Sequence, residues 1–253
     1  MKIHPVAVNT FKEAVRDKIL YVILVFSILT IGSVWLINPL SLGEFEKITK
    51  DLGLASISFF GLLISVFVGT RLVYEEIAKK TLYTILPKPV ERWEFIIGKY
   101  FGLVLVLLLT VAVMTIFFFL ITFFNIGEMD FNLLSAIFLT FIELGVITAI
   151  AVFFSSFTSP ILSAIFTVGI FIAGHLSRDL NALAKMTEST ATGVVCKILY
   201  YILPNLSNFN VRGEVVHHVP ITLEYVLLSV LYGLLYCSIV LIVSIQIFKR
   251  KNF

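Results

Sequence analysis

The chain has 253 residues, of which 59% are hydrophobic and only 14% are charged. A soluble domain usually carries about a quarter of charged residues, so this composition, with a mean hydropathy of +1.03, excludes a soluble globular protein. The formal net charge of +3 is too small to indicate a nucleic-acid partner, and we expect none. The sequence therefore indicates an integral membrane protein with room for several spans and hardly a second folded domain.

The N-terminal stretch predicts a short helix at the membrane surface. Residues 5–18 place Val8, Phe11 and Val15 on one side of a helix and charged side chains elsewhere. That pattern is typical of an amphipathic helix lying in the interface. The apolar run that follows is too long for a signal peptide and has no small-residue cleavage site, so we expect it to remain as a span.

Six apolar segments then predict an all-α membrane fold in a single transmembrane domain, residues 1–253. Each segment is close to the roughly 20 residues that cross about 30 Å of hydrocarbon. The fifth is the shortest, and the sequence leaves open whether it crosses fully or dips in and returns. The predicted spans are residues 19–38, 52–73, 100–124, 133–157, 161–176 and 225–248.

The distribution of Lys and Arg predicts the orientation. Most of the 19 basic residues fall on one side if the N-terminus is cytoplasmic, and cytoplasmic segments carry the excess of basic residues. We therefore expect a multi-pass protein of the plasma (inner) membrane with both termini cytoplasmic. Residues 74–99 then lie inside and residues 177–224 outside, where an extracytoplasmic partner is left open.

The charged interval after the second span predicts a short amphipathic helix on the cytoplasmic face at residues 74–86. Two acid-before-base pairs at i,i+4 spacing support it, Glu75 with Lys79 and Glu76 with Lys80. A pair of prolines then ends the helix and leaves a stiff, extended elbow before the third span. The candidate site residues of this interval are Glu75, Glu76, Lys79, Lys80, Thr81, Leu82, Ile85, Pro89 and Arg92.

Two further patterns lie inside predicted spans. Gly61, Ser65 and Gly69 place a small residue at every fourth position, which lets another helix approach closely, either in the same chain or in a second copy. Glu143 lies near the middle of the fourth span. An ionisable group there has to face protein or a water-filled space, so a substrate or proton path and a purely structural hydrogen bond are both open.

Motifs for enzymatic chemistry are missing. No GxxxxGK[ST] loop exists to bind ATP phosphates, and no group of residues at ligand spacing indicates a metal, so we expect no bound cofactor. Glu75-Glu76 with Phe171 and His175 faintly resembles the CAAX-type intramembrane proteases, but the rest of that pattern is absent. The alternatives left open are an ATP-independent carrier or channel and, less favoured, such a protease.

In the order and spacing of its motifs, the chain resembles the membrane subunit of type-2 ATP-binding-cassette (ABC) transporters, the family that includes the nitrous-oxide-reductase maturation permease. The likeness extends over essentially the whole chain. It is carried by Phe11-Lys12-Glu13, Arg16-Asp17-Lys18, Glu75, Glu76, Thr81, Leu86, Lys88, Pro89, Arg92, Gly98, Lys99, Glu143, Ser155-Ser156-Phe157, Gly174-His175, Pro204-Asn205-Leu206 and Phe209-Asn210.

The resemblance implies a six-span subunit that pairs in the lipid membrane with a second copy or a related permease and exports substrate along the subunit interface. It also implies two separate ATPase subunits, which bind ATP and Mg and grip the N-terminal helix and the helix at residues 74–86. The transported substrate is not named by any motif of the sequence.

Overall fold

The computed structural model describes residues 3–37, 44–78, 91–127, 130–177, 179, 182, 191–217 and 219–250. Helix is the only regular secondary structure within these ranges, which confirms the all-α class. The helices are α1 Ile3–Val15, α2 Lys18–Ile37, α3 Phe45–Ala78, α4 Arg92–Ile126, α5 Asn132–Ser155, α6 Pro160–His175, α8 Ala191–Ile202, η3 Leu206–Asn208, α9 Arg212–Val216 and α10 Leu223–Arg250.

Among the described residues, four helices are long and apolar enough to cross a membrane: α3, α4, α5 and α10. The pair α1 and α2, bent by 62° at the break between them, gives a fifth candidate. The predicted span at residues 161–176 corresponds to α6, whose 16 residues reach only about 24 Å. That length is short of the roughly 30 Å of a bilayer core, so the described helices give four or five spans where the sequence predicted six.

Two helices extend past the predicted limits of their spans. Helix α3 already begins at Phe45, in the predicted outer loop, where the Lys50 side chain is buried and pairs with Glu46 at 2.6 Å and Asp130 at 2.9 Å. Its other end continues to Ala78, so residues 74–78 belong to α3, and the rest of the helix predicted at residues 74–86 lies outside the described residues. Helix α4 begins at Arg92, behind a capping box made by Glu91 and Glu94.

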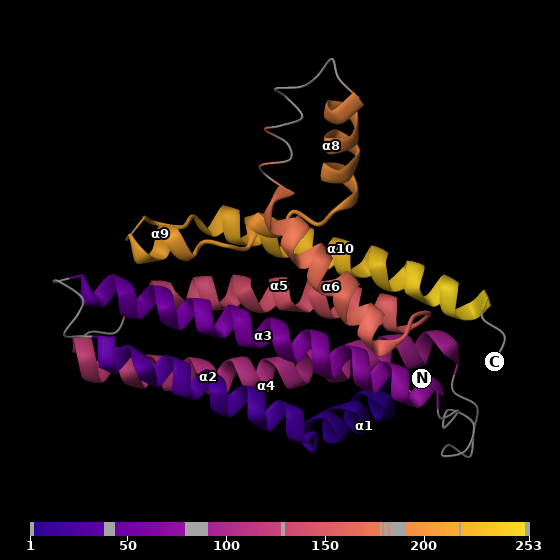
Figure 1. Ribbon diagram of the computed structural model, residues 1–253, viewed down its shortest axis with the longest axis horizontal. Coiled ribbons are helices and arrows are strands. Elements are labelled where there is room, and N and C mark those ends of the chain that lie inside the picture. The colour runs from indigo at the N-terminus through magenta and orange to yellow at the C-terminus, as the bar shows by residue number, and fades with distance from the viewer. Residues whose placement is uncertain are drawn as a thin grey trace.

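Helices α2 to α5 run side by side along the long axis, and α10 covers one face of α5 (Figure 1). Helix α5 is the centre of the bundle. In its most apolar stretch, 67% of the residues are buried, whereas the corresponding value for α10 is 17%. Helix α6 crosses obliquely, and α8 projects away from the bundle (Figure 1). The exposed leucines of α10 therefore form an apolar outer face suited to lipid.

Small residues let α3 lie close to its neighbours. A Cβ on Gly61 would lie 2.4 Å from Leu144 of α5, and one on Gly69 would contact Ala151 at 3.6 Å. Ser65 is buried between them and donates its hydroxyl to the carbonyl of Gly61. The stripe predicted from the sequence thus faces helices of the same chain.

Candidate functional site

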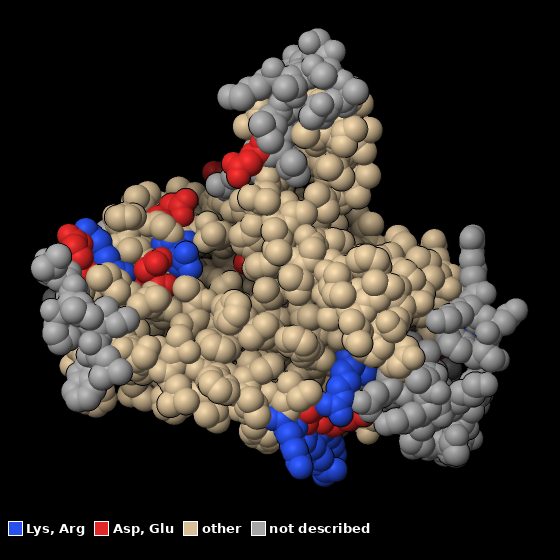
Figure 2. Space-filling view, viewed as in Figure 1, with Lys and Arg blue, Asp and Glu red and all other residues tan. Residues whose placement is uncertain are grey.

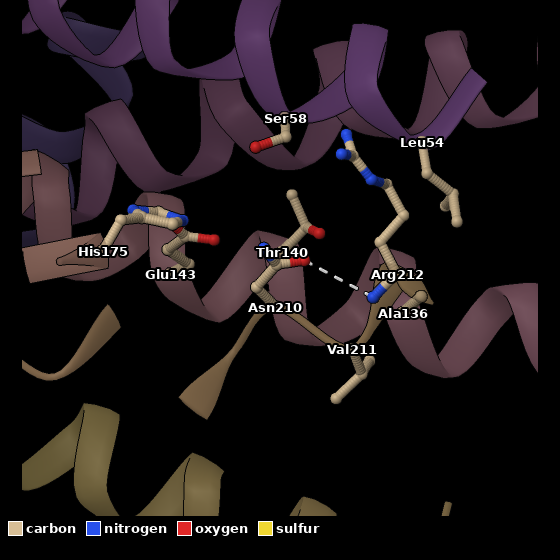
Figure 3. Close-up of a pocket in the computed structure, with 9 residues that line it drawn as sticks. All are labelled: Leu54, Ser58, Ala136, Thr140, Glu143, His175, Asn210, Val211 and Arg212. Atoms are coloured by element: carbon tan, nitrogen blue, oxygen red, sulfur yellow. Dashed lines mark hydrogen bonds and ion pairs between the residues drawn. The ribbon is translucent and has the colours of Figure 1, made fainter. Parts of the chain in front are cut away.

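A cavity of about 210 Å³ opens between α3, α5, α6 and the segment that leads into α9 (Figure 3). In the space-filling view, a hollow lies beside the mixed group of basic and acidic side chains at the left end of the molecule (Figure 2). The cavity is lined by Leu54, Ser58, Ala136, Thr140, Glu143, His175, Asn210, Val211 and Arg212.

The inner end of the cavity holds an acid and a histidine. Glu143, on the most buried helix, is only 2% exposed. Its Oε1 atom lies 3.3 Å from Nε2 of His175, the last residue of α6, and makes no geometrically acceptable hydrogen bond. The other ring nitrogen of His175, Nδ1, lies 3.2 Å from the carbonyl oxygen of Phe171, one turn earlier. An ionisable pair thus lies at the inner end of the cavity.

The mouth of the cavity carries a second ion pair. Arg212 Nε lies 2.9 Å from Asp51 Oδ1, and both side chains are partly exposed. The backbone N–H of Arg212 donates to Asn210 Oδ1 at 3.4 Å, which fixes the turn that precedes α9 (Figure 3). Because Arg212 and Asp51 neutralise each other, the mouth adds little net charge to the cavity.

The segment at residues 204–211 reaches the cavity because α6 and α10 hold it. Ser177 donates to Asn205 Oδ1 at 2.8 Å, and the Asn205 backbone N–H donates to the Tyr232 hydroxyl at 2.8 Å. Gly174 lets this segment approach closely, since a Cβ there would lie 2.8 Å from both Leu206 and the carbonyl oxygen of Pro204. These contacts bring Asn210 and Arg212 to the same cavity as Glu143.

Sequence reasoning found only Glu143 as a site residue of this cavity. Thr140 precedes it by one helical turn, so the i,i+3 spacing could have indicated that both face the same space. Asn210 was noted only as part of a motif, and Ser58, Asp51 and Arg212 gave no signal. Their contribution depends on how three distant parts of the chain pack.

A second polar region lies at the lower edge of the molecule in the space-filling view, right of the middle, where basic and acidic side chains gather near the bend between α1 and α2 (Figure 2). Helix α1 packs closely on the first turns of α4. A Cβ on Gly98 would lie 2.7 Å from the Val6 side chain, and one on Gly102 would lie 2.6 Å from Thr10. Both glycines are therefore needed for the two helices to touch.

Ion pairs and hydrogen bonds connect the helix ends of this region. Arg71 near the end of α3 pairs with Asp17, between α1 and α2, at 3.3 Å. Arg92, the first residue of α4, donates to the carbonyl oxygens of Phe248 at 3.1 Å and Lys249 at 2.7 Å, at the end of α10. The end of α3 is thus joined to the bend between α1 and α2, and the start of α4 is joined to the end of α10.

Three of the residues at which the ATPases are expected to bind lie within the described ranges, next to this region. Glu75 and Glu76 belong to the last turn of α3, and Arg92 belongs to the first turn of α4. The other residues predicted for coupling, which lie outside the described ranges, are Lys79, Lys80, Thr81, Leu82, Ile85 and Pro89.

The residues that suggested an intramembrane protease are not brought together. His175 lines the cavity together with Ser58 of α3. Glu75 lies 17 residues further along the same helix, which corresponds to about 26 Å. The acidic pair and the histidine therefore do not form one site in this chain.

The fold and the cavity define a multi-pass helical membrane protein with a polar site inside its apolar bundle. The family model described as ABC-2 family transporter protein matches residues 4–253, and the chain belongs to that family. It is therefore a permease subunit of an ABC transporter, and the family implies ABC ATPase partners and a dimeric arrangement. Among curated proteins, no match to the chain was found.

Proposed function

We propose that this chain is the permease of an ABC exporter and that separate ATPase subunits dock on residues 74–86 at its cytoplasmic end. The proposed complex has two permeases, either two copies of this chain or one copy with a related permease, each with six crossings of the plasma membrane. ATP and Mg belong to the partner subunits, because the chain has no phosphate-binding loop of its own. Within the type-2 family, we place it with the nitrous-oxide-reductase maturation permease group.

The observation that supports this proposal is the set of contacts made by Arg71 and Arg92 near the end of α3 and at the start of α4. Arg71 fastens the end of α3 to Asp17, and Arg92 fastens the start of α4 to the end of α10. A force applied to residues 74–86 would act directly on α3 and α4 and reach α1 and α10 through these contacts. Packed helices joined in this way move as rigid bodies, as alternating access requires.

The transport path is proposed to include the cavity at Glu143. Ionisable residues inside membrane spans mark substrate and ion pathways more often than they mark purely structural contacts. The cavity connects that buried carboxyl with the end of the bundle that carries α9, opposite to the ATPase-docking end (Figure 1). This arrangement suits release of a substrate to the outer side.

Extraction of the tagged chain from its native membrane tests the docking. We expect an ATPase subunit with a phosphate-binding loop to co-purify at about one copy per permease. Reversing both acids, Glu75→Lys with Glu76→Lys, should release the ATPase or uncouple ATP hydrolysis from transport. Glu214→Lys, an exposed acid on α9, is the matched control and should have no effect. Recovery of the chain without an ATPase would favour the ATP-independent carrier, and normal coupling in the double variant would exclude docking through these acids.

A further inference from the structure

The contacts of His175 determine how many protons the pair with Glu143 can hold. A backbone carbonyl oxygen only accepts hydrogen bonds, so Nδ1, which faces the Phe171 carbonyl at 3.2 Å, carries a hydrogen. Nε2 lies 3.3 Å from Glu143 Oε1, and the pair without net charge holds one more proton, either on the carboxyl group or on the ring. Without that proton, two lone pairs would face each other inside the bundle, so its loss requires another positive charge in its place.

Among the described residues, the basic side chains next to the cavity are already paired with acids. Arg212 lines the cavity but is engaged by Asp51 at 2.9 Å. Lys50, one turn before Leu54 on α3, pairs with Glu46 at 2.6 Å and with Asp130 at 2.9 Å. A cationic ligand is therefore the candidate for the positive charge that takes the place of the proton.

The shape and lining of the cavity favour an organic cation over a metal ion. Its volume of about 210 Å³ is an order of magnitude above the roughly 10–15 Å³ that a single water requires. Within the described part of the chain, no group of three His, Cys, Asp or Glu could hold a metal. The remaining polar lining consists of the hydroxyls of Ser58 and Thr140 and the amide of Asn210, whose oxygens accept hydrogen bonds from an ammonium group.

We propose that this cavity binds a protonated primary amine against Glu143 and releases one proton in exchange. The ammonium N–H groups donate to the Glu143 carboxylate, the shared proton leaves to water past Arg212 and Asp51, and His175 stays neutral with its Nδ1 hydrogen. One positive charge enters and one leaves, so the charge inside the membrane does not change. The inference rests on the proposed function only in placing this cavity on the export path, and binding can be measured without transport.

Calorimetry on the full chain, purified in detergent, tests the exchange with butylammonium as the probe. Two buffers of different ionisation enthalpy, at one pH, give the number of protons released for each probe bound. We expect one site per chain and about one proton released. Butan-1-ol, which matches the probe in size but has no charge, should not bind measurably. Glu143→Gln should weaken binding at least tenfold and abolish proton release, and the exposed Glu214→Gln should leave both unchanged.

Several results would overturn the inference. They are equal binding of butan-1-ol, binding without proton release, undiminished binding by Glu143→Gln, and no binding of butylammonium to the native chain. The buffer comparison uses the native chain alone, so the test does not depend on whether a variant folds. None of these outcomes affects ATPase docking, which is judged separately by co-purification and by the reversal of Glu75 and Glu76.

Discussion

Glu143 is a carboxyl group inside an apolar bundle, and its cost there depends on its partners. Insertion of an ionised acid at the centre of a span costs about 2.5–3.5 kcal/mol. His175 lies 3.3 Å away, so the two groups can hold one proton between them. With that proton, the ring and the carboxyl group together carry no net charge. Its Oε1 still lacks a well-formed hydrogen bond, so this residue is not explained by stability alone.

Gly174 decides whether the 204–211 segment can close the cavity, and Gly174→Ala tests this. The added Cβ would lie 2.8 Å from the Pro204 carbonyl oxygen and from Leu206, and a backbone oxygen cannot move aside cheaply. We expect a loss of about 1–3 kcal/mol in unfolding free energy, measured as a lower Tm in detergent, together with weaker butylammonium binding. Gly169→Ala on the same helix has open space around its Cβ and should not lower Tm. An unchanged Tm in Gly174→Ala would mean that the segment is not held by this contact.

At the level of elements, helix α1 is part of the bundle and not only a surface helix. Its contact with α4 is the most extensive packing of any helix pair, and Thr10 and Ala14 are fully buried. Sequence reasoning placed this helix flat in the interface from its amphipathic pattern, which gave no indication of the partner. The partner is specified by Gly98 and Gly102, whose missing side chains form the groove that receives α1.

Gly102→Ala tests this packing. A Cβ there would lie 2.6 Å from Thr10 and 2.7 Å from the carbonyl oxygen of Ala7, so α1 would have to move away from α4. We expect a lower Tm, corresponding to about 1–3 kcal/mol, and faster hydrogen exchange of the α1 amides. Gly32→Ala on α2 has nothing within 4 Å and serves as the control. Equal exchange rates in α1 of both variants would contradict the role given to Gly102.

At the level of the whole molecule, the two polar regions lie at opposite ends of the bundle (Figure 2). Glu44 precedes α3 and Lys47 lies in its first turn, at the end of the bundle that carries the cavity. Lys12 on α1 lies at the other end. If the basic excess marks the cytoplasmic side, the α1 end faces the cytoplasm and the cavity opens toward the outside.

Labelling of introduced cysteines tests this orientation. In a Cys196→Ser background, Lys47→Cys should react with a membrane-impermeant maleimide in intact cells. Lys12→Cys, also exposed, should react only after the membrane is permeabilised. Cys237 is buried and should remain silent in both variants. Labelling of Lys12→Cys in intact cells, with Lys47→Cys protected, would reverse the orientation and the proposed export direction.

The apolar segments of the sequence determined the class of fold and the approximate place of each span, because hydrophobic length is a local property. They did not determine the ends of α3 and α4. Those ends depend on partners that are distant in the sequence, such as Lys50 with Asp130, which are 80 residues apart, and Arg92 with the end of α10. The turn of α3 that carries the buried Lys50 is stabilised by Glu46 and Asp130, which pair with its ammonium group.

For the candidate site too, local sequence determined one part and tertiary structure decided the rest. The position of Glu143 inside a span was enough to predict that it faces protein or a cavity, since lipid cannot solvate a carboxyl group. The identity of its neighbours, His175, Ser58 and Arg212, was decided by tertiary structure alone. Close contacts at Gly174 and hydrogen bonds from Asn205 bring these residues together from separate parts of the chain, and no local pattern encodes that packing.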